Sequence, residues 1–148
     1  MQIQAFSHFF LRDLDKCIAE VEAFPDEASL WRIAGDVKNP AGTLALHLAG
    51  NLQHFIGAIL GQTGYVRDRE REFSARGISG KELTDGLKTT RQVVEETLGN
   101  LSDERLAEVF PASHFGEGRT TAHALLHLLA HLNYHLGQLN YLRRLVAV

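Results

Sequence analysis

The chain of 148 residues carries a net charge of −3, and 45% of its residues are hydrophobic and 22% charged, a composition typical of one globular domain spanning residues 1–148. The slight negative charge argues against nucleic acid as the main partner, because phosphate binding requires a basic face. The sequence has no apolar run of about 18 residues and no signal-like N-terminus, so it predicts a cytoplasmic protein without a membrane partner.

The first half of the chain contains the patterns of two helices. Large apolar residues recur every three or four positions over residues 5–21, which predicts a helix that faces the core. Asn39-Pro40 is a helix start signal, because asparagine caps helices well and proline is tolerated at the first helical position. We therefore expect a second helix from this point to about Leu60, closed by the glycines of residues 61–64.

Two further helices are predicted in the second half. Residues 67–73 form a dense run of charges, which we interpret as a solvated or interface segment. Ser79 and Glu82 form a capping box for a third helix that continues to about residue 101. Residues 101–119 contain a proline and two glycines and are expected to form a connection. Thr120 or Thr121 then caps a fourth helix that ends near residue 144.

Four amphipathic helices without a convincing strand predict an all-α fold. We expect a four-helix bundle with a long connection between helices two and three and another between helices three and four.

The fourth predicted helix carries histidines at four-residue intervals: His123, His127, His131 and His135. Side chains at positions i and i+4 are neighbours on a helix surface, so an adjacent pair of these imidazoles can bind one ion. The series drifts by about 40° around the helix at each step, so all four cannot point at one ion. The candidate pairs are 123/127, 127/131 and 131/135, and spacing alone leaves the choice open.

Two histidines from one helix need at least one further ligand. Cys17 is the only cysteine, so a cysteine-based zinc site cannot form within the chain and the donors must be nitrogen or oxygen. His47 and His54 of the second helix are the candidates. They lie on nearly the same face but about two turns apart, so one of them at most is expected to reach a given ion. Histidines that merely pack in the bundle remain the alternative.

Four motifs support one of these choices: P-A-G-T over residues 40–43, L-H-L-A-G-N over 46–51, R-D-R-E-R-E-F over 67–73 and H-L-N-Y-H-L-G-Q over 131–138. Together they resemble the DinB-like superfamily of metal-binding four-helix bundles, to which bacillithiol-transferase-like proteins belong, and the resemblance covers nearly the whole chain. It implies a three-histidine metal site formed by His47, His131 and His135. His54 and His127 are then neighbours of the site rather than ligands.

Three residues beside these histidines have expected supporting roles. Asn51 lies one turn beyond His47 and is expected to orient a ligand, and Gln138 lies three residues after His135 and is expected to hydrogen bond beside the site. An ordinary polar position on a helix face is the alternative for both. Gly137 lacks a side chain one turn from the histidine pair, which is expected to let a neighbouring helix approach closely.

Three neutral imidazoles favour a divalent transition metal such as zinc, nickel, iron or cobalt over magnesium or calcium. The resemblance implies a metal-dependent enzyme that activates a low-molecular-weight thiol or water, of the thiol S-transferase or hydrolase type, with a small-molecule thiol and an electrophilic substrate as partners. It also implies a homodimer. The alternative is a non-catalytic metal-binding bundle in stress response or sensing. An open coordination position favours the enzyme, and a fourth protein ligand counts against it.

Overall fold

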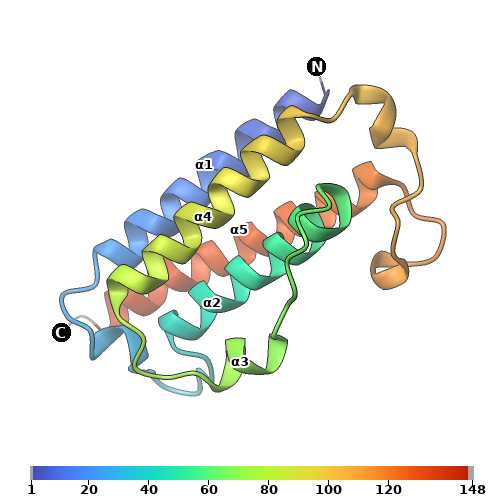
Figure 1. The fold of residues 1–148 in the computed structure, drawn as a ribbon. Helices are drawn as coiled ribbons and strands as arrows, with labels where there is room; N and C mark the ends of the chain where they lie inside the picture. The colour runs from blue at the N-terminus through green and yellow to red at the C-terminus, as the bar shows by residue number, and fades with distance from the viewer. Residues whose placement is uncertain (1, 147–148) are drawn as a thin grey trace.

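Four long helices make up most of the protein, whose computed structural model describes residues 2–146 (Figure 1). They are α1 (Gln2–Glu22), α2 (Ala41–Leu52), α4 (Gly80–Gly99) and α5 (Thr121–Val146), and a short α3 (Arg69–Ser74) lies between α2 and α4. Both α1 and α2 pack along α4 and α5. The predicted all-α four-helix bundle is confirmed, with long connections after its second and third helices.

The apolar stripes of the four helices meet in one core. On α5 the stripe consists of Leu125, Leu128, Leu132 and Leu139, each at most 1% exposed, and burying a leucine side chain contributes about 1.5–3 kcal/mol. The same core contains Cys17 of α1. Burial raises the pKa of its thiol to about 12, so this cysteine is a packing residue and not a nucleophile at neutral pH.

The start of α2 lies one residue later than the sequence predicts. Pro40, not Asn39, occupies the capping position, and its carbonyl oxygen accepts a hydrogen bond of 3.1 Å from the backbone N–H of Leu44. The Asn39 side chain makes no capping hydrogen bond. The expected assignment of Asn39 as the cap was therefore wrong, because the extended backbone of Pro40 itself (ψ 165°) ends the preceding segment.

The second helix reaches Leu60 as predicted, but its last part, Gln53–Leu60, is π-helical. The backbone N–H of Gly61 bonds the carbonyl of Ile56, five residues back, at 2.9 Å. Because a π turn is wider than an α turn, residues after Leu52 rotate out of the register that a regular helix would give them. The expectation that His54 shares the face of His47 rested on that regular register.

The capping residues of the other two helices agree with the sequence. The hydroxyl of Ser79 accepts a hydrogen bond from the N–H of Glu82 at 3.1 Å, at the start of α4. Thr120 caps α5, since its hydroxyl accepts from the N–H of His123 at 3.1 Å. These two caps fix where the helices begin.

The connection between α4 and α5 folds back beside the start of α5. It contains two 3₁₀ turns, Asp103–Ala107 and Ser113–Phe115. Val109 and Thr120 form an isolated antiparallel bridge, and no strand occurs within residues 2–146. This arrangement places the Ser113–Phe115 turn near the first half of α5 (Figure 1).

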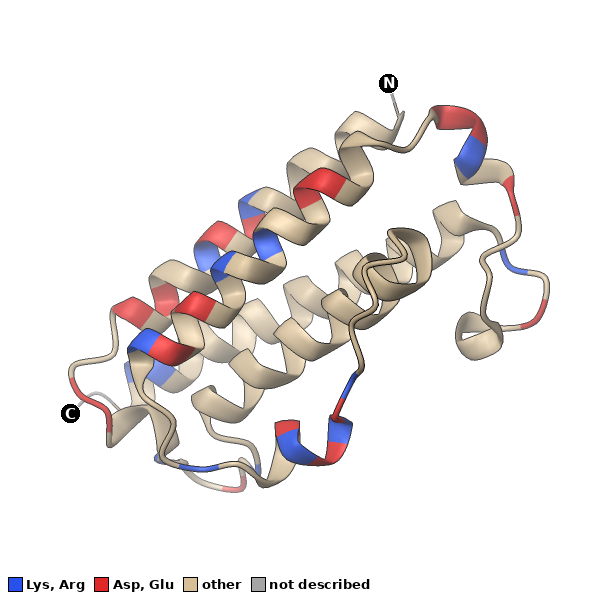
Figure 2. Cartoon of the chain, in the orientation of Figure 1, with Lys and Arg blue, Asp and Glu red and all other residues tan. Residues whose placement is uncertain are grey.

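Charged residues are distributed unevenly over the helices (Figure 2). They occur along α1, α3 and α4, whereas α2 has none and the charges of α5 are confined to Arg143 and Arg144. None of the helices within residues 2–146 has the length and apolar character that crossing a membrane would require. The histidines predicted to bind a metal lie on α2, which has no charged residue, and on the uncharged part of α5 before Arg143.

Candidate metal centre

Three histidines from two helices meet in the bundle. His47 comes from α2, and His131 and His135 come from successive turns of α5. The Nε2 atom of His131 lies 3.1 Å from Nε2 of His47 and 3.1 Å from Nε2 of His135. The potential ligand atoms of all three lie within 4.8 Å of one another. Among the histidine pairs that the sequence left open, the structure brings 131/135 together with His47.

Hydrogen bonds fix the protonation of two of these rings. Nδ1 of His47 lies 3.1 Å from a carboxylate oxygen of Glu72, and Nδ1 of His135 lies 2.6 Å from the amide oxygen of Gln138. Both partners are acceptors, so each Nδ1 carries the proton and donates it. The two Nε2 atoms are consequently unprotonated, with their lone pairs available.

This arrangement fits a metal ion. A proton on Nε2 of His131 could satisfy one of the two lone pairs but not both, because each N–H donates mainly to one acceptor. In a tetrahedral zinc site, bonds of about 2.0–2.1 Å place neighbouring nitrogens about 3.3–3.4 Å apart. The observed separations of 3.1 Å are close to that spacing. Three nitrogen donors would hold a divalent transition metal and leave a position for an exogenous ligand.

Glu72 supports His47 from the charged segment, and the sequence did not predict this. Its side chain is buried, and Arg67 binds it through two hydrogen bonds, Nε to Oε2 at 2.8 Å and Nη2 to Oε1 at 2.9 Å. Burial opposes ionisation of Glu72, but the hydrogen bonds from Arg67 and His47 outweigh it and lower the pKa of its carboxyl. The interpretation of residues 67–73 as merely solvated or interfacial was wrong for these two residues.

The path of α3 explains how the carboxylate reaches the site. Asp68 caps α3 by accepting a hydrogen bond from the N–H of Arg71 at 3.0 Å, and Phe73 packs against the His47 ring with 4.9 Å between centroids. A charged run gives no periodic signal that separates one inward carboxylate from its exposed neighbours. The R-D-R-E-R-E-F motif was the one sequence signal for this segment. It does not show that Glu72 contacts His47, because that contact depends on the tertiary structure.

Gly50 makes room for Glu72. A Cβ atom at position 50 would lie 2.6 Å from Cδ of Glu72, in conflict with the carboxylate that bonds His47. Gly137 has no such role, because a Cβ atom there would meet nothing within 4 Å and the residue is exposed. The expectation that Gly137 permits close approach of a helix was wrong. The close approach occurs instead between α2 and the Glu72 side chain of α3.

The two polar residues expected to support the site lie beside it. Gln138 bonds Nδ1 of His135, as described above. Asn51 is 7% exposed and lies one turn after His47. Its Oδ1 atom is buried and has no hydrogen-bond partner within residues 2–146. Gln138 therefore orients the ring of His135, whereas the Asn51 oxygen is buried without a hydrogen-bond partner in the described residues.

The electrostatics of the site favour the neutral form of the two imidazoles on α5, His131 and His135. Burial and the neighbouring imidazoles of His135 and His47 lower the pKa of His131 to about 4. Burial also lowers the pKa of His135, against the opposing effect of its hydrogen bond to Gln138. At neutral pH both rings are therefore neutral, and a neutral imidazole binds a metal through its unprotonated nitrogen.

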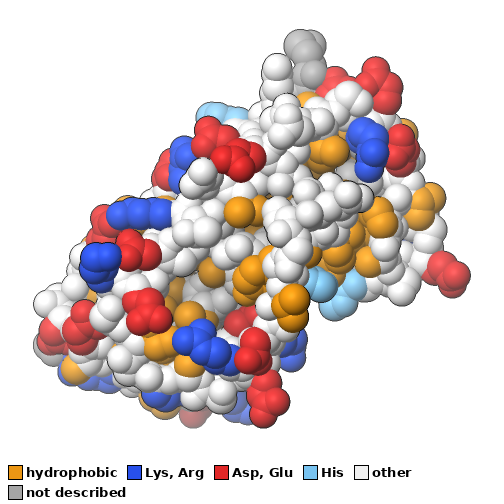
Figure 3. Space-filling view, viewed as in Figure 1, with side chains coloured by type: hydrophobic (Ala, Val, Ile, Leu, Met, Phe, Trp, Pro, Cys, Tyr) orange, Lys and Arg blue, Asp and Glu red, His pale blue; other side chains and the backbone are white. Residues whose placement is uncertain are grey.

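The other two histidines of the α5 series and His54 of the π-helical segment do not join this group. His123 lies exposed in the first turn of α5, and His54 packs its ring against Phe55 with 4.7 Å between centroids. His127 is exposed and contacts the ring of Phe115 at 5.0 Å. Figure 3 shows histidine side chains reaching the surface between the α3 segment and the connection that precedes α5.

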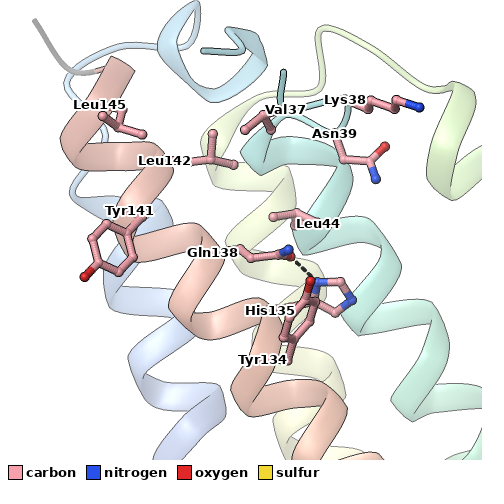
Figure 4. A pocket seen from close by; sticks show the side chains of 10 residues that line it. All are labelled: Val37, Lys38, Asn39, Leu44, Tyr134, His135, Gln138, Tyr141, Leu142 and Leu145. Carbon is pink, nitrogen blue, oxygen red and sulfur yellow. Dashed lines mark hydrogen bonds between the residues drawn. The ribbon is translucent and has the colours of Figure 1, made fainter. Parts of the chain in front are cut away.

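Two cavities border the three histidines. The larger, of about 420 Å³, lies between α5 and the loop before α2, with His135 and Gln138 toward one end and Leu145 toward the other (Figure 4). Its remaining lining is largely apolar and includes Tyr134 and Tyr141. The smaller, of about 160 Å³, is bordered by His47 and His131. Small molecules can therefore reach the imidazoles from two sides of the group.

Comparisons with known proteins agree with this arrangement. Residues 10–139 match the DinB superfamily. A crystal structure of a DinB-like protein from Bacillus cereus superimposes with a TM-score of 0.76 at 18% sequence identity, over 95% of this chain and 90% of that chain, and so shares the fold. A comparison with curated proteins finds no match. Because the family match spans most of its length, the chain belongs to the DinB superfamily.

Proposed function

We propose that this protein is a metal-dependent enzyme whose ion, zinc, nickel or iron, is held by His47, His131 and His135. One observation carries the proposal: three Nε2 atoms converge, and no further histidine, cysteine, aspartate or glutamate within residues 2–146 joins their group. A site closed by a fourth protein ligand would suit a structural ion, whereas three ligands suit a catalytic one.

The residues around the histidines have definable tasks in such an enzyme. When bound, a divalent ion held by three nitrogens acts as a Lewis acid that lowers the pKa of a thiol or of water. Glu72 and Gln138 hold the Nδ1 protons of their histidines and so fix ring orientation. The cavity of about 420 Å³ can receive a substrate beside His135 and exclude part of its hydration.

We propose thiol S-transfer as the reaction, with a low-molecular-weight thiol as donor and an electrophile as acceptor. The largely apolar lining of the cavity beside His135 favours an apolar electrophile. We also propose a cytosolic setting, where small thiols are kept reduced. Hydrolysis is the second candidate, since the same site would activate water in place of a thiol.

A non-catalytic, metal-binding role is the alternative of a different class. It is favoured by the state of Glu72, the carboxylate bonded to the site, which is already paired with Arg67 and so is not free to act as a base. Within residues 2–146, no aspartate or glutamate lines either cavity beside the histidines. Metal binding without turnover would support this alternative.

The test is a transfer assay on metal-loaded protein. Cysteine, glutathione and coenzyme A are each offered with 1-chloro-2,4-dinitrobenzene, in which the sulfur forms a bond to the ring carbon, chloride leaves and the thiol proton passes to the buffer. We expect turnover with at least one thiol that is abolished by a chelator and by His47→Ala but retained in His123→Ala. Stoichiometric metal without turnover on any of these thiols, or on ester substrates, would favour the non-catalytic role.

A further inference from the structure

The histidine series of α5 continues from the metal centre toward the surface. His135 and His131 are partly buried, whereas His127 and His123 are exposed. Each step of four residues advances about 6 Å along the helix and about 40° around it, and side chains at this spacing are neighbours. An ion can therefore contact adjacent members of the series in turn. The metal centre uses the inner pair, which leaves the two outer imidazoles without a task.

The smaller cavity connects this series to the metal centre. His127 lines it together with His47 and His131, two of the three histidines of the centre. The connection before α5 brings a further imidazole, that of His114, to the same lining. Both His114 and His127 are exposed. The cavity thus has imidazoles on its solvent side as well as at the metal centre.

One phenylalanine packs against both outer imidazoles of the cavity. The ring centroid of Phe115 lies 5.1 Å from that of His114 and 5.0 Å from that of His127. Phe115 also contacts the ring of Phe55, in the π-helical segment, at 4.9 Å. Ring contacts of this length have preferred geometries and restrict the side chains that make them. The two imidazoles are therefore held at the cavity while they remain accessible to solvent.

Cationic side chains border both cavities and oppose the passage of a metal ion. In the smaller cavity, Arg67 is paired with Glu72 through two hydrogen bonds, which offset its charge. Arg69 is exposed and makes no ion pair with a carboxylate within residues 2–146. The larger cavity has Lys38 and one histidine, His135, in its lining. An ion meets an unpaired cation on either route, but within the described residues the smaller cavity alone offers imidazoles ahead of the metal centre.

We propose that the metal ion enters the protein through the smaller cavity, where His127 and His114 capture it first and pass it to the ligands of the centre. Capture makes the later binding steps intramolecular, at a high effective concentration. Imidazole nitrogen is a common ligand of divalent transition metals, so each step replaces one nitrogen contact or water ligand of the ion by another nitrogen. The inference rests on the proposed function, because it requires that the three histidines hold a metal.

The test measures the rates of metal uptake and release. Cobalt(II), whose visible absorption changes with its coordination, is mixed rapidly with metal-free protein, and the bound ion is then released into excess EDTA. His127→Gln should slow uptake and release alike, about tenfold, because an entry path lowers the same barrier in both directions, while the affinity stays that of the wild type. His114→Gln should act in the same direction. His8→Gln, at an exposed histidine of α1, is the matched control and should change neither rate.

Charge changes identify which cavity the ion uses. Arg69→Gln removes a cation from the lining of the smaller cavity and should speed uptake about twofold or more at low ionic strength, because the ion is repelled less. Lys38→Gln makes the same change in the lining of the larger cavity and should leave the uptake rate unchanged. Faster uptake in Lys38→Gln, with wild-type rates in Arg69→Gln and His127→Gln, would place entry in the larger cavity and overturn the proposal.

Equilibrium binding separates the entry route from the metal centre. One cobalt ion per chain in both the wild type and His127→Gln, with slower exchange in the variant, supports the route, even if the thiol-transfer assay fails. One ion in both with equal rates would overturn the route and leave the centre intact. A weaker affinity of His127→Gln with an unchanged uptake rate would make His127 a ligand and would also contradict the route. A wild type that binds no stoichiometric cobalt would overturn the metal centre and the route with it.

Discussion

At the scale of single residues, the site depends on how two Nδ1 protons are held. Glu72 accepts one and Gln138 accepts the other, so the Nε2 atoms of His47 and His135 face the centre with free lone pairs. Glu72 is itself held by Arg67. A carboxylate behind a ligating imidazole fixes its tautomer and raises its basicity.

Replacing Glu72 should therefore weaken metal binding without removing a ligand. We expect Glu72→Gln to lower zinc affinity about 10- to 100-fold, the usual cost of losing such a partner. Glu70→Gln, on the exposed side of α3, is the matched control and should retain wild-type affinity. Competition with a chromophoric chelator measures both. Equal affinities for the two variants would show that the carboxylate does not act on the site.

Gly50 offers a test of the same contact from the opposite side. A methyl group at position 50 would conflict with the Glu72 carboxylate, so Gly50→Ala should lower zinc affinity as Glu72→Gln does. Gly137→Ala should leave affinity unchanged and stabilise α5 by about 0.5–1 kcal/mol, because alanine is the better helix residue. The same competition assay and thermal unfolding measure the two effects. Wild-type affinity in Gly50→Ala would contradict the proposed packing.

These residues show what the sequence could and could not predict about the site. His131, His135 and Gln138 occupy one helix at fixed spacing, so their proximity follows from helical geometry. His47 was assigned by resemblance, since spacing did not distinguish it from His54. The parts played by Glu72 and Gly50 depend on the path of the chain after α2, which no periodic pattern specifies.

At the scale of secondary structure, α1 and α5 are joined by a polar contact near their ends. Glu20 of α1 accepts hydrogen bonds from Asn140 at 2.7 Å and from Arg143 at 2.6 Å. Burial opposes ionisation of Glu20, but these bonds and the charges of Arg143 and Arg144 lower the pKa of its carboxyl. The contact therefore stabilises the ionised form of Glu20 in the folded protein.

This contact predicts a pH-dependent contribution to stability. Because the folded pKa of Glu20 lies below its ordinary 4.5, the contribution is fully present above that value and is lost as the pH falls through the folded pKa. Glu20→Gln should cost about 1 kcal/mol near neutral pH, allowing for partial exposure. Glu22→Gln, at an exposed position of α1, is the control. Urea unfolding should show the deficit of Glu20→Gln shrinking at acidic pH, and a constant deficit would contradict this account.

The helices were predicted well because their signals are local. The capping residues of α4 and α5 and the apolar stripes identified the four long helices before any contact was known. The π-helical segment Gln53–Leu60 and the start of α2 at Ala41 were not predicted. A regular α-helix would satisfy the same backbone groups with its own hydrogen bonds. The residue pattern therefore does not distinguish a π-helical segment or a later helix start from a regular helix.

At the scale of the whole molecule, α5 presents an exposed face without charge over much of its length. Leu126, Tyr134, Tyr141 and Leu145 are 57–67% exposed, and the charges of the helix are confined to Arg143 and Arg144 (Figure 2). We propose that the protein is a homodimer that buries this face. A second copy there would also cover part of the rim of the cavity beside His135, which Tyr134 and Tyr141 line.

Light scattering during size-exclusion chromatography tests the dimer. We expect twice the chain mass of 16.5 kDa for the wild type. Tyr141→Glu should shift the protein toward monomer, because it places a charge in the apolar face. Val66→Glu introduces the same charge at an exposed residue outside α5 and should remain dimeric. A monomeric wild type would contradict the proposal.

The function proposed for this protein requires that its three clustered histidines hold a metal ion. Elemental analysis of purified protein, loaded with zinc and freed of excess, measures this directly for the wild type and for His47→Ala, His131→Ala, His135→Ala and the control His123→Ala. We predict one ion per chain in the wild type and in His123→Ala, and loss of that ion in each of the other three. Unchanged metal content in all three variants, or none in the wild type, would contradict the metal centre.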